Sequence, residues 1–153
     1  MFDKICVLGC GLIGSSLLRA IEKKNLSKEI SAFDKSQDVS IYLAKNFSFK
    51  INKSAGEAVK DSDLVIISSP LSSYKEILLS MKSSLKKNVI LTDTGSAKKE
   101  VNKIINNLNL NNVNWIASHP IAGTEFSGPE AGLAELFENR WCILSADQQM
   151  HKE

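Results

Sequence analysis

The sequence has little of what marks proteins that act on nucleic acids or membranes. It holds 19 Lys and Arg against 17 Asp and Glu, with no basic block, so nucleic acid and anionic membrane are poor candidates for a partner. Apolar runs such as Leu64 to Ile67 are far too short to span a bilayer. The first residues lack the basic segment and the cleavage site of a signal peptide, which argues against secretion.

Cysteine is also scarce. Cys6, Cys10 and Cys142 are odd in number and lack metal-ligand spacing, so we expect reduced thiols in a cytoplasmic protein and no metal site. The remaining composition, 43% hydrophobic and 24% charged over 153 residues, is that of a globular protein. This length suits one domain with a single substantial core.

Short β-rich runs alternate with longer stretches of helical periodicity along most of the chain. The runs predict strands at Phe2–Leu8, Glu29–Phe33, Phe47–Ile51, Asp63–Ser68, Asn88–Thr92 and Trp115–Ser118. The stretches between them predict helices at Leu12–Lys24, Val39–Lys45, Ala55–Lys60, Tyr74–Leu85 and Lys98–Leu108. Such alternation with short connections predicts an α/β domain of the Rossmann type, a doubly wound parallel sheet with strand order 3-2-1-4-5-6.

The periodicity weakens near residue 119. Gly and Pro residues predict a loop over residues 118–129, which we expect to carry part of an active site. A short helix at Ala131–Leu136 and a last strand at Trp141–Leu144 follow, and the polar segment 146–153 is expected to fray. The predicted domain therefore spans residues 1–145.

A glycine motif lies directly after the first predicted strand and opens the first predicted helix. In the segment Gly9-Cys10-Gly11-Leu12-Ile13-Gly14, the pattern is G-x-G-x-x-G. The first glycine of this pattern allows a tight turn, the second lets the backbone approach a pyrophosphate, and the third lets helix and strand pack closely. The helix N-terminus favours the negative charge. We therefore predict that residues Gly9, Gly11, Leu12, Ile13 and Gly14 bind a dinucleotide.

An acid ends the second predicted strand. Asp34 follows Gly14 at about the 20-residue interval of the acid that accepts hydrogen bonds from ribose hydroxyls. The alternative is a structural turn followed by a helix-capping Asp. Because a carboxylate repels a 2′-phosphate, Asp34 favours NAD over NADP, although Lys35 beside it is able to pair with that phosphate.

Polar residues also follow the fourth and fifth predicted strands, at the edge where doubly wound sheets bind ligands. Ser68, Ser69 and Pro70 are typical of a helix start, which does not exclude cofactor contact. We predict that Asp93 contacts the cofactor too. Ser96 either caps the next helix or points its hydroxyl at the nicotinamide or the substrate.

His119 follows the sixth predicted strand and is the only histidine outside the tail. A single histidine is usually structural, but this one is expected where the sheet meets the nicotinamide, and Pro120 favours an extended backbone there. An imidazole with an ordinary pKa of about 6.5 suits a proton acceptor at neutral pH. His119 is therefore the candidate base.

These residues together resemble the prephenate and arogenate dehydrogenases of tyrosine biosynthesis. The resemblance runs from the Gly9 loop to Leu144, and its specific part is HPIAGTEFSG from His119 to Gly128, supported by DTGSAK at 93–98 and SSP at 68–70. It implies oxidative decarboxylation of prephenate by NAD, giving 4-hydroxyphenylpyruvate. By this resemblance His119 takes the proton of the ring hydroxyl, and Ser96 bonds near that hydroxyl and orients the histidine. Thr124 and Glu125 line the substrate pocket.

The chain departs from the family pattern after its last predicted strand. Family members continue with a helical dimerisation domain, which carries an arginine that binds a substrate carboxylate, so the resemblance implies an N-terminal half without that domain. Apolar surface near the His119 loop would then favour self-association or a partner chain that supplies the domain. Arg140 has no motif basis for the carboxylate role. Three alternatives stay open: an arogenate dehydrogenase, a catalytically idle NAD-binding module, and another small reductase such as an imine or 3-hydroxyacid dehydrogenase.

Overall fold

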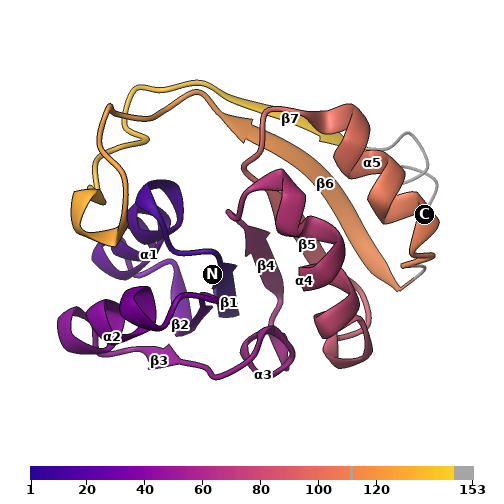
Figure 1. Cartoon of the computed structure of the whole chain (residues 1–153), viewed down its shortest axis with the longest axis horizontal. Coiled ribbons are helices and arrows are strands. Elements are labelled where there is room, and N and C mark those ends of the chain that lie inside the picture. Colours follow the sequence, from indigo (N-terminus) through magenta and orange to yellow (C-terminus); the bar gives the residue numbers. More distant parts are fainter. Residues whose placement is uncertain (111, 147–153) are drawn as a thin grey trace.

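The computed structural model describes residues 1–110 and 112–146, which form one sheet with helices on both faces (Figure 1). The strands are β1 (Phe2–Leu8), β2 (Ser27–Phe33), β3 (Lys50–Ile51), β4 (Leu64–Ile67), β5 (Val89–Asp93), β6 (Val113–Pro120) and β7 (Cys142–Ala146). The α-helices are α1 (Leu12–Lys23), α2 (Gln37–Asn46), α3 (Ala55–Val59), α4 (Tyr74–Met81) and α5 (Lys98–Asn107). Short 3-10 helices are η1 (Leu71–Ser73), η2 (Lys82–Ser84) and η3 (Pro129–Ala131).

The sheet has the strand order β3-β2-β1-β4-β5-β6-β7. The predicted order of the first six strands and their parallel pairing are confirmed. The seventh strand corrects the prediction of a purely parallel sheet, because β7 pairs antiparallel with β6 and places Ile143 opposite His119. The chain returns to the sheet edge at the carboxyl end of β6 without a helical crossover, so β7 runs back along its neighbour.

Two apolar layers hold the helices to the sheet. Side chains alternate along β1, so Ile5 and Val7 pack with α1 and α2, while Cys6 and Leu8 pack with α3, α4 and α5. All four side chains are buried. Burial on both faces explains the nearly continuous apolar runs of the central strands.

The segment after β6 differs most from the sequence prediction. His119 and Pro120 belong to β6, so the loop begins later than expected. The predicted helix at Ala131–Leu136 is wrong: η3 ends at Ala131 and turns follow it. Gly132 packs so closely on α1 that a Cβ there would lie 2.2 Å from Ser15 Oγ. The next backbone N–H, of Leu133, donates to Ser16 Oγ rather than within a helix.

The connection from β6 to β7 crosses the molecule (Figure 1). It leaves the sheet after β6, places η3 beside α1, and returns as β7. Ion pairs from Glu135 to Lys23 and from Glu138 to Lys24 tie the connection to α1. Apart from Ala146, the predicted tail at 146–153 lies outside the described residues. No helix in the described ranges is long and apolar enough to cross a membrane.

Candidate active site

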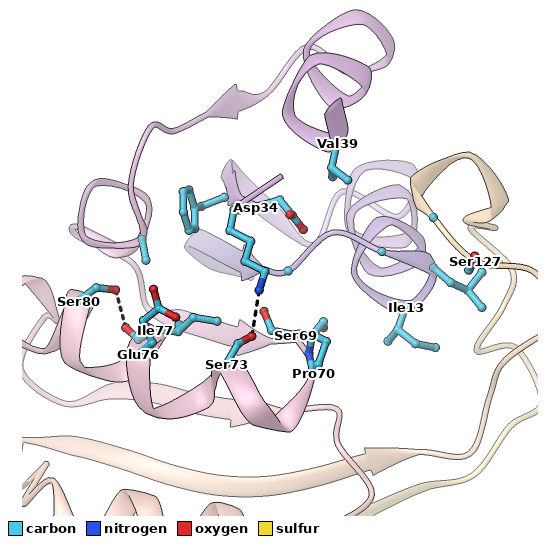
Figure 2. Close-up of a pocket in the computed structure, with 18 of the residues that line it drawn as sticks. Ile13, Asp34, Val39, Ser69, Pro70, Ser73, Glu76, Ile77, Ser80 and Ser127 are labelled. Carbon is cyan, nitrogen blue, oxygen red and sulfur yellow. Dashed lines mark hydrogen bonds between the residues drawn. The ribbon is translucent and has the colours of Figure 1, made fainter. Parts of the chain in front are cut away.

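A cavity of about 680 Å³ lies at the carboxyl ends of β1, β2 and β4 (Figure 2). Its size is that of a small-molecule site. Most of the predicted cofactor-binding residues line it, namely Gly9, Gly11, Leu12, Ile13, Asp34, Ser68, Ser69 and Pro70. We call it the glycine-loop cavity.

The three motif glycines have different surroundings. Gly9 has a φ of +85°, and a Cβ there would lie 2.3 Å from Ser69 Oγ. A Cβ on Gly14 would lie 1.9 Å from the Gly9 carbonyl oxygen, so this glycine lets α1 pack on the loop. A Cβ on Gly11 would meet no protein atom within 4 Å. The protein itself therefore needs glycine at the first and third positions, whereas the second is open toward the cavity.

This loop offers hydrogen-bond donors to an anion. Gly11 is the N-cap of α1, so no side chain of the N-cap residue binds the first N–H groups of this helix. The first turn of α1 also contains no acidic residue. The first N–H groups of a helix have no acceptor within the helix, and the helix dipole favours negative charge there. Next to this loop, the buried Ser68 Oγ has no hydrogen-bond partner among the described residues. The open Gly11, the free N–H groups and this hydroxyl fit a bound pyrophosphate.

Asp34 links the glycine loop to the start of α2. Its Oδ2 accepts a hydrogen bond from Cys10 N at 2.7 Å, and its Oδ1 accepts one from Ser36 N at 2.8 Å. The helix cap is Ser36, whose hydroxyl accepts from Val39 N, so the capping alternative for Asp34 is wrong. A carboxylate has about four acceptor positions. The two bonds therefore orient Asp34 in the cavity wall and leave acceptor capacity for ribose hydroxyls.

The thiol inside the glycine motif is inert. Cys10 is fully buried, and burial, followed by the charge of Asp34, raises the pKa of its thiol far above the ordinary range. Burial also raises the pKa of the Cys6 thiol to about 12. Both side chains belong to the apolar core and stay protonated at neutral pH.

Several cavity residues were missed by the sequence analysis. Ser73, Glu76, Ile77 and Ser80 face the cavity from η1 and α4, opposite Asp34 (Figure 2). Lys35 reaches across to them, with its Nζ 3.5 Å from Ser73 Oγ. The segment Lys53–Ala55 closes another side, and Phe126, Ser127 and Gly128 come from the loop after β6. Glu76, Ile77 and Ser80 share one face of α4 by their i, i+1, i+4 spacing, which the sequence shows. The spacing does not tell which face of the helix lies toward the strand ends, so it could not predict that these residues line the cavity.

Asp93, which we predicted to contact the cofactor, does not line the glycine-loop cavity. Its side chain is fully buried and forms an ion pair with Lys98, whose Nζ lies 2.6 Å from both carboxylate oxygens. The carboxylate also accepts hydrogen bonds from Tyr74 Oη, Gly95 N and Ser118 N. Burial and the Asp93 charge raise the pKa of Tyr74, so its phenol remains a donor. Asp93 thus holds the ends of β5 and β6 together.

The network around Asp93 supports the residues next to it. Thr94 N donates to Ile67 O at 3.0 Å, and Thr94 O faces His119 Nδ1 at 3.4 Å. An N–H on Nδ1 pointing at this carbonyl leaves the lone pair on Nε2 as an acceptor. Ser96 is exposed and does not cap α5, whose N-cap is Ala97, so the capping alternative for Ser96 is wrong.

His119 lines a second, shallower cavity of about 410 Å³, which it shares with Pro120, Ile121, Ala122, Gly123 and Arg140. We call it the histidine cavity. Thr124 and Glu125 are exposed on the loop between the residues of the two cavities. The sequence motif after β6 therefore serves both cavities, Ile121–Gly123 lining one and Phe126–Gly128 the other. Within the described ranges, no group of three or more His, Cys, Asp or Glu residues is placed to hold a metal ion.

Comparison with known proteins identifies relatives of this chain. Residues 17–153 match the family model described as prephenate dehydrogenase, nucleotide-binding domain. The chain is 39% identical over 148 residues to the cyclohexadienyl dehydrogenase of Zymomonas mobilis, covering 96% of this chain and 50% of the relative. It is 34% identical over 152 residues to the prephenate dehydrogenase of Lactococcus lactis, covering 98% of this chain and 43% of the relative.

A solved structure agrees with the fold. Prephenate dehydrogenase from Aquifex aeolicus, in complex with hydroxyphenyl propionate and NAD⁺, superposes with a TM-score of 0.82 at 26% identity. The match covers 97% of this chain and 52% of that one. The chain thus spans about half the length of the curated relatives it matches.

Proposed function

The chain belongs to the prephenate dehydrogenase family, and on this premise we propose that it is the NAD-binding part of an enzyme that oxidises and decarboxylates prephenate. The products are 4-hydroxyphenylpyruvate, CO₂ and NADH. The observation that carries the proposal is the glycine-loop cavity, where Gly11 leaves space for a pyrophosphate and Asp34 stands oriented for a ribose. The carboxylate of Asp34 disfavours a 2′-phosphate, which supports NAD over NADP.

His119 is the proposed proton acceptor. With Nδ1 directed to Thr94 O, its Nε2 accepts the proton of the substrate hydroxyl. Bound at the glycine-loop cavity, NAD would supply the hydride acceptor for the carbon that carries this hydroxyl. Loss of CO₂ makes the ring aromatic, so the driving force belongs to the substrate, and the protein supplies alignment and one base.

Three exposed residues complete the proposed site. Ser96, two residues after Thr94, is assigned to hold the substrate hydroxyl close to His119. Thr124 and Glu125 are assigned to contact the substrate from the loop that joins the two cavities. In this proposal replacing each by Ala raises KM or lowers kcat without changing NAD affinity.

Two other functions stay open. Arogenate differs from prephenate only in its side chain, and the described residues contain no group assigned to that difference. A catalytically idle NAD-binding module is favoured by one observation: His119 lines the histidine cavity and not the glycine-loop cavity.

We also propose a cytoplasmic location, because the three cysteines are free thiols, as in reducing compartments.

The test is a titration of the chain with NAD and NADP by calorimetry, followed by addition of prephenate or arogenate while NADH absorbance is recorded. We expect tighter binding of NAD than of NADP. If NADH forms, the chain alone is a working dehydrogenase, and His119→Gln should abolish that turnover while its NAD affinity stays unchanged. NAD binding without NADH formation from either substrate supports a cofactor-binding part that does not turn over by itself. Absence of binding by both dinucleotides contradicts the cofactor assignment.

A further inference from the structure

The histidine cavity also contains a charged side chain that the sequence motifs leave unassigned. Arg140 lines it together with His119, although 21 positions separate the two residues in the sequence. The antiparallel pairing of β6 and β7 brings them together, and Ile121 N donates to Trp141 O at 2.8 Å just beyond the paired strands. The backbone on each side of the cavity is therefore held in place.

The charge of Arg140 is not balanced by its neighbours. The acids on the preceding turns, Glu135 and Glu138, pair with Lys23 and Lys24 at the C-terminal end of α1. Across residues 1–110 and 112–146, no carboxylate forms an ion pair with Arg140. Arg140, an exposed residue, thus lines the same cavity as His119 and has no ion-pair partner among the described residues.

The two side chains suit different parts of one ligand. A guanidinium offers a planar fork of donors that matches a carboxylate with two parallel hydrogen bonds. The imidazole, with Nδ1 facing Thr94 O, offers an acceptor to a hydroxyl. Pro120, Ile121 and Ala122 supply apolar wall around them. A hydroxy acid with an apolar body fits this set better than a small inorganic anion, which would use only the guanidinium.

We propose that Arg140 binds the carboxylate of a ligand whose hydroxyl meets His119, which makes the histidine cavity a carboxylate subsite of the substrate site. The inference rests on the proposed function for the role of His119 and adds Arg140 as a residue that determines specificity. Substrates that lack the carboxylate lose the interaction, and a cation of different shape at position 140 replaces it only in part.

The experiment compares two probes that differ only in this group, 3-(4-hydroxyphenyl)propionate and its neutral amide, by NMR titration of the chain with and without NAD. We expect the wild-type chain to bind the acid about tenfold more tightly than the amide, a preference of about 1.4 kcal/mol. Arg140→Gln abolishes the preference and leaves amide binding unchanged. Arg140→Lys retains part of it.

Lys87→Gln is the matched control, because it removes one exposed positive charge just before the amino end of β5, away from the carboxyl ends of the strands. It should leave the preference intact. Equal binding of acid and amide by the wild-type chain, or no binding of either, overturns the inference, as does a preference that persists in Arg140→Gln. Displacement of the acid by equimolar inorganic phosphate would show a general anion site and also overturn it. Failure of the proposed function appears separately, as absence of NAD binding.

Discussion

At the scale of single residues, the glycine loop separates what the fold requires from what a ligand requires. Gly14 has the Gly9 carbonyl where its Cβ would be, whereas Gly11 has only open cavity there. Both residues belong to one short motif, so their substitution by Ala is a matched pair.

We expect Gly11→Ala to change the free energy of unfolding by less than about 0.5 kcal/mol. Its NAD affinity should nevertheless fall at least about tenfold, because the added methyl occupies the space of the pyrophosphate. Gly14→Ala should lose about 3 kcal/mol of stability, because the loop and α1 must move apart. Urea unfolding and calorimetric titration measure the two effects. Equal loss of stability in both variants would contradict this division of roles.

At the scale of elements, the ends of β5 and β6 depend on one buried ion pair. Removing the partner of a buried charge is strongly destabilising because the remaining charge is left unsolvated. Lys98→Met leaves the buried Asp93 carboxylate with neutral donors only. We expect a loss of about 3 kcal/mol in urea unfolding.

Lys98→Met should also change the environment of the His119 imidazole, although residue 98 is not expected to contact that ring. Thr94, whose carbonyl faces His119 Nδ1, directly follows Asp93. A shift of the His119 ring resonances in Lys98→Met is therefore expected, and Lys103→Met on the exposed face of α5 is the control. Unchanged stability and an unchanged His119 spectrum would show that the network is dispensable.

A second contact between elements makes the stability of the fold depend on pH. It lies at the amino ends of the central strands. The Asp63 carboxylate, at the start of β4, bonds to Lys86 Nζ and to the backbone N–H groups of Lys4 and Asp3. The hydrogen bond from Lys86, followed by that from Lys4 N, holds the pKa of Asp63 below its ordinary value. Because the pKa is lower in the folded state, this carboxylate stabilises the fold above about pH 4. The contribution is lost as the pH falls through the folded-state pKa.

Asp63→Asn should therefore lower stability by about 1 kcal/mol at pH 7 and have less effect near pH 3. The measurement is the urea midpoint of both proteins across this range. Asp61→Asn, which alters a neighbouring exposed acid, should leave the pH dependence unchanged. A difference between wild type and Asp63→Asn that does not shrink on acidification would contradict the assignment.

At the scale of the whole molecule, large apolar side chains are exposed along β7 and the loop after β6. Trp141 is 84% exposed, Leu144 67%, Phe126 66% and Ile143 59%. The apolar surface expected near the His119 loop is therefore present. β7 is also an edge strand, with backbone groups available for pairing.

We predict that the chain self-associates through this surface, with mean mass by light scattering rising with concentration. Ile143→Lys should reduce the association, because a charged edge strand resists pairing. Leu79→Lys is the control, since it replaces an apolar side chain of similar exposure on α4. A wild-type chain that stays monomeric at all concentrations would count against the prediction.

The sequence by itself determined the features that depend on local pattern. Period-two and helical spacing predicted the order of the first six strands, and the glycine motif with Asp34 predicted most of one wall of the glycine-loop cavity. These signals lie within one element or across one turn, where backbone geometry leaves few choices. The roles predicted for Ser96, His119, Thr124 and Glu125 remain predictions for the experiments above.

The tertiary structure alone decided what depends on contacts between distant segments. Asp93 follows a strand like a ligand-binding acid, yet Lys98, Tyr74 and Ser118 turn its carboxylate inward. The segment at Ala131–Leu136 has helical spacing, yet it packs on α1, where Leu133 N donates to Ser16 Oγ, and it forms separate turns in place of a helix. Arg140 meets His119 only because β7 returns antiparallel to β6. The direction of a side chain at a strand end depends on hydrogen-bonding and charged partners from other segments of the chain. Local periodicity in the sequence does not predict which residues those partners are.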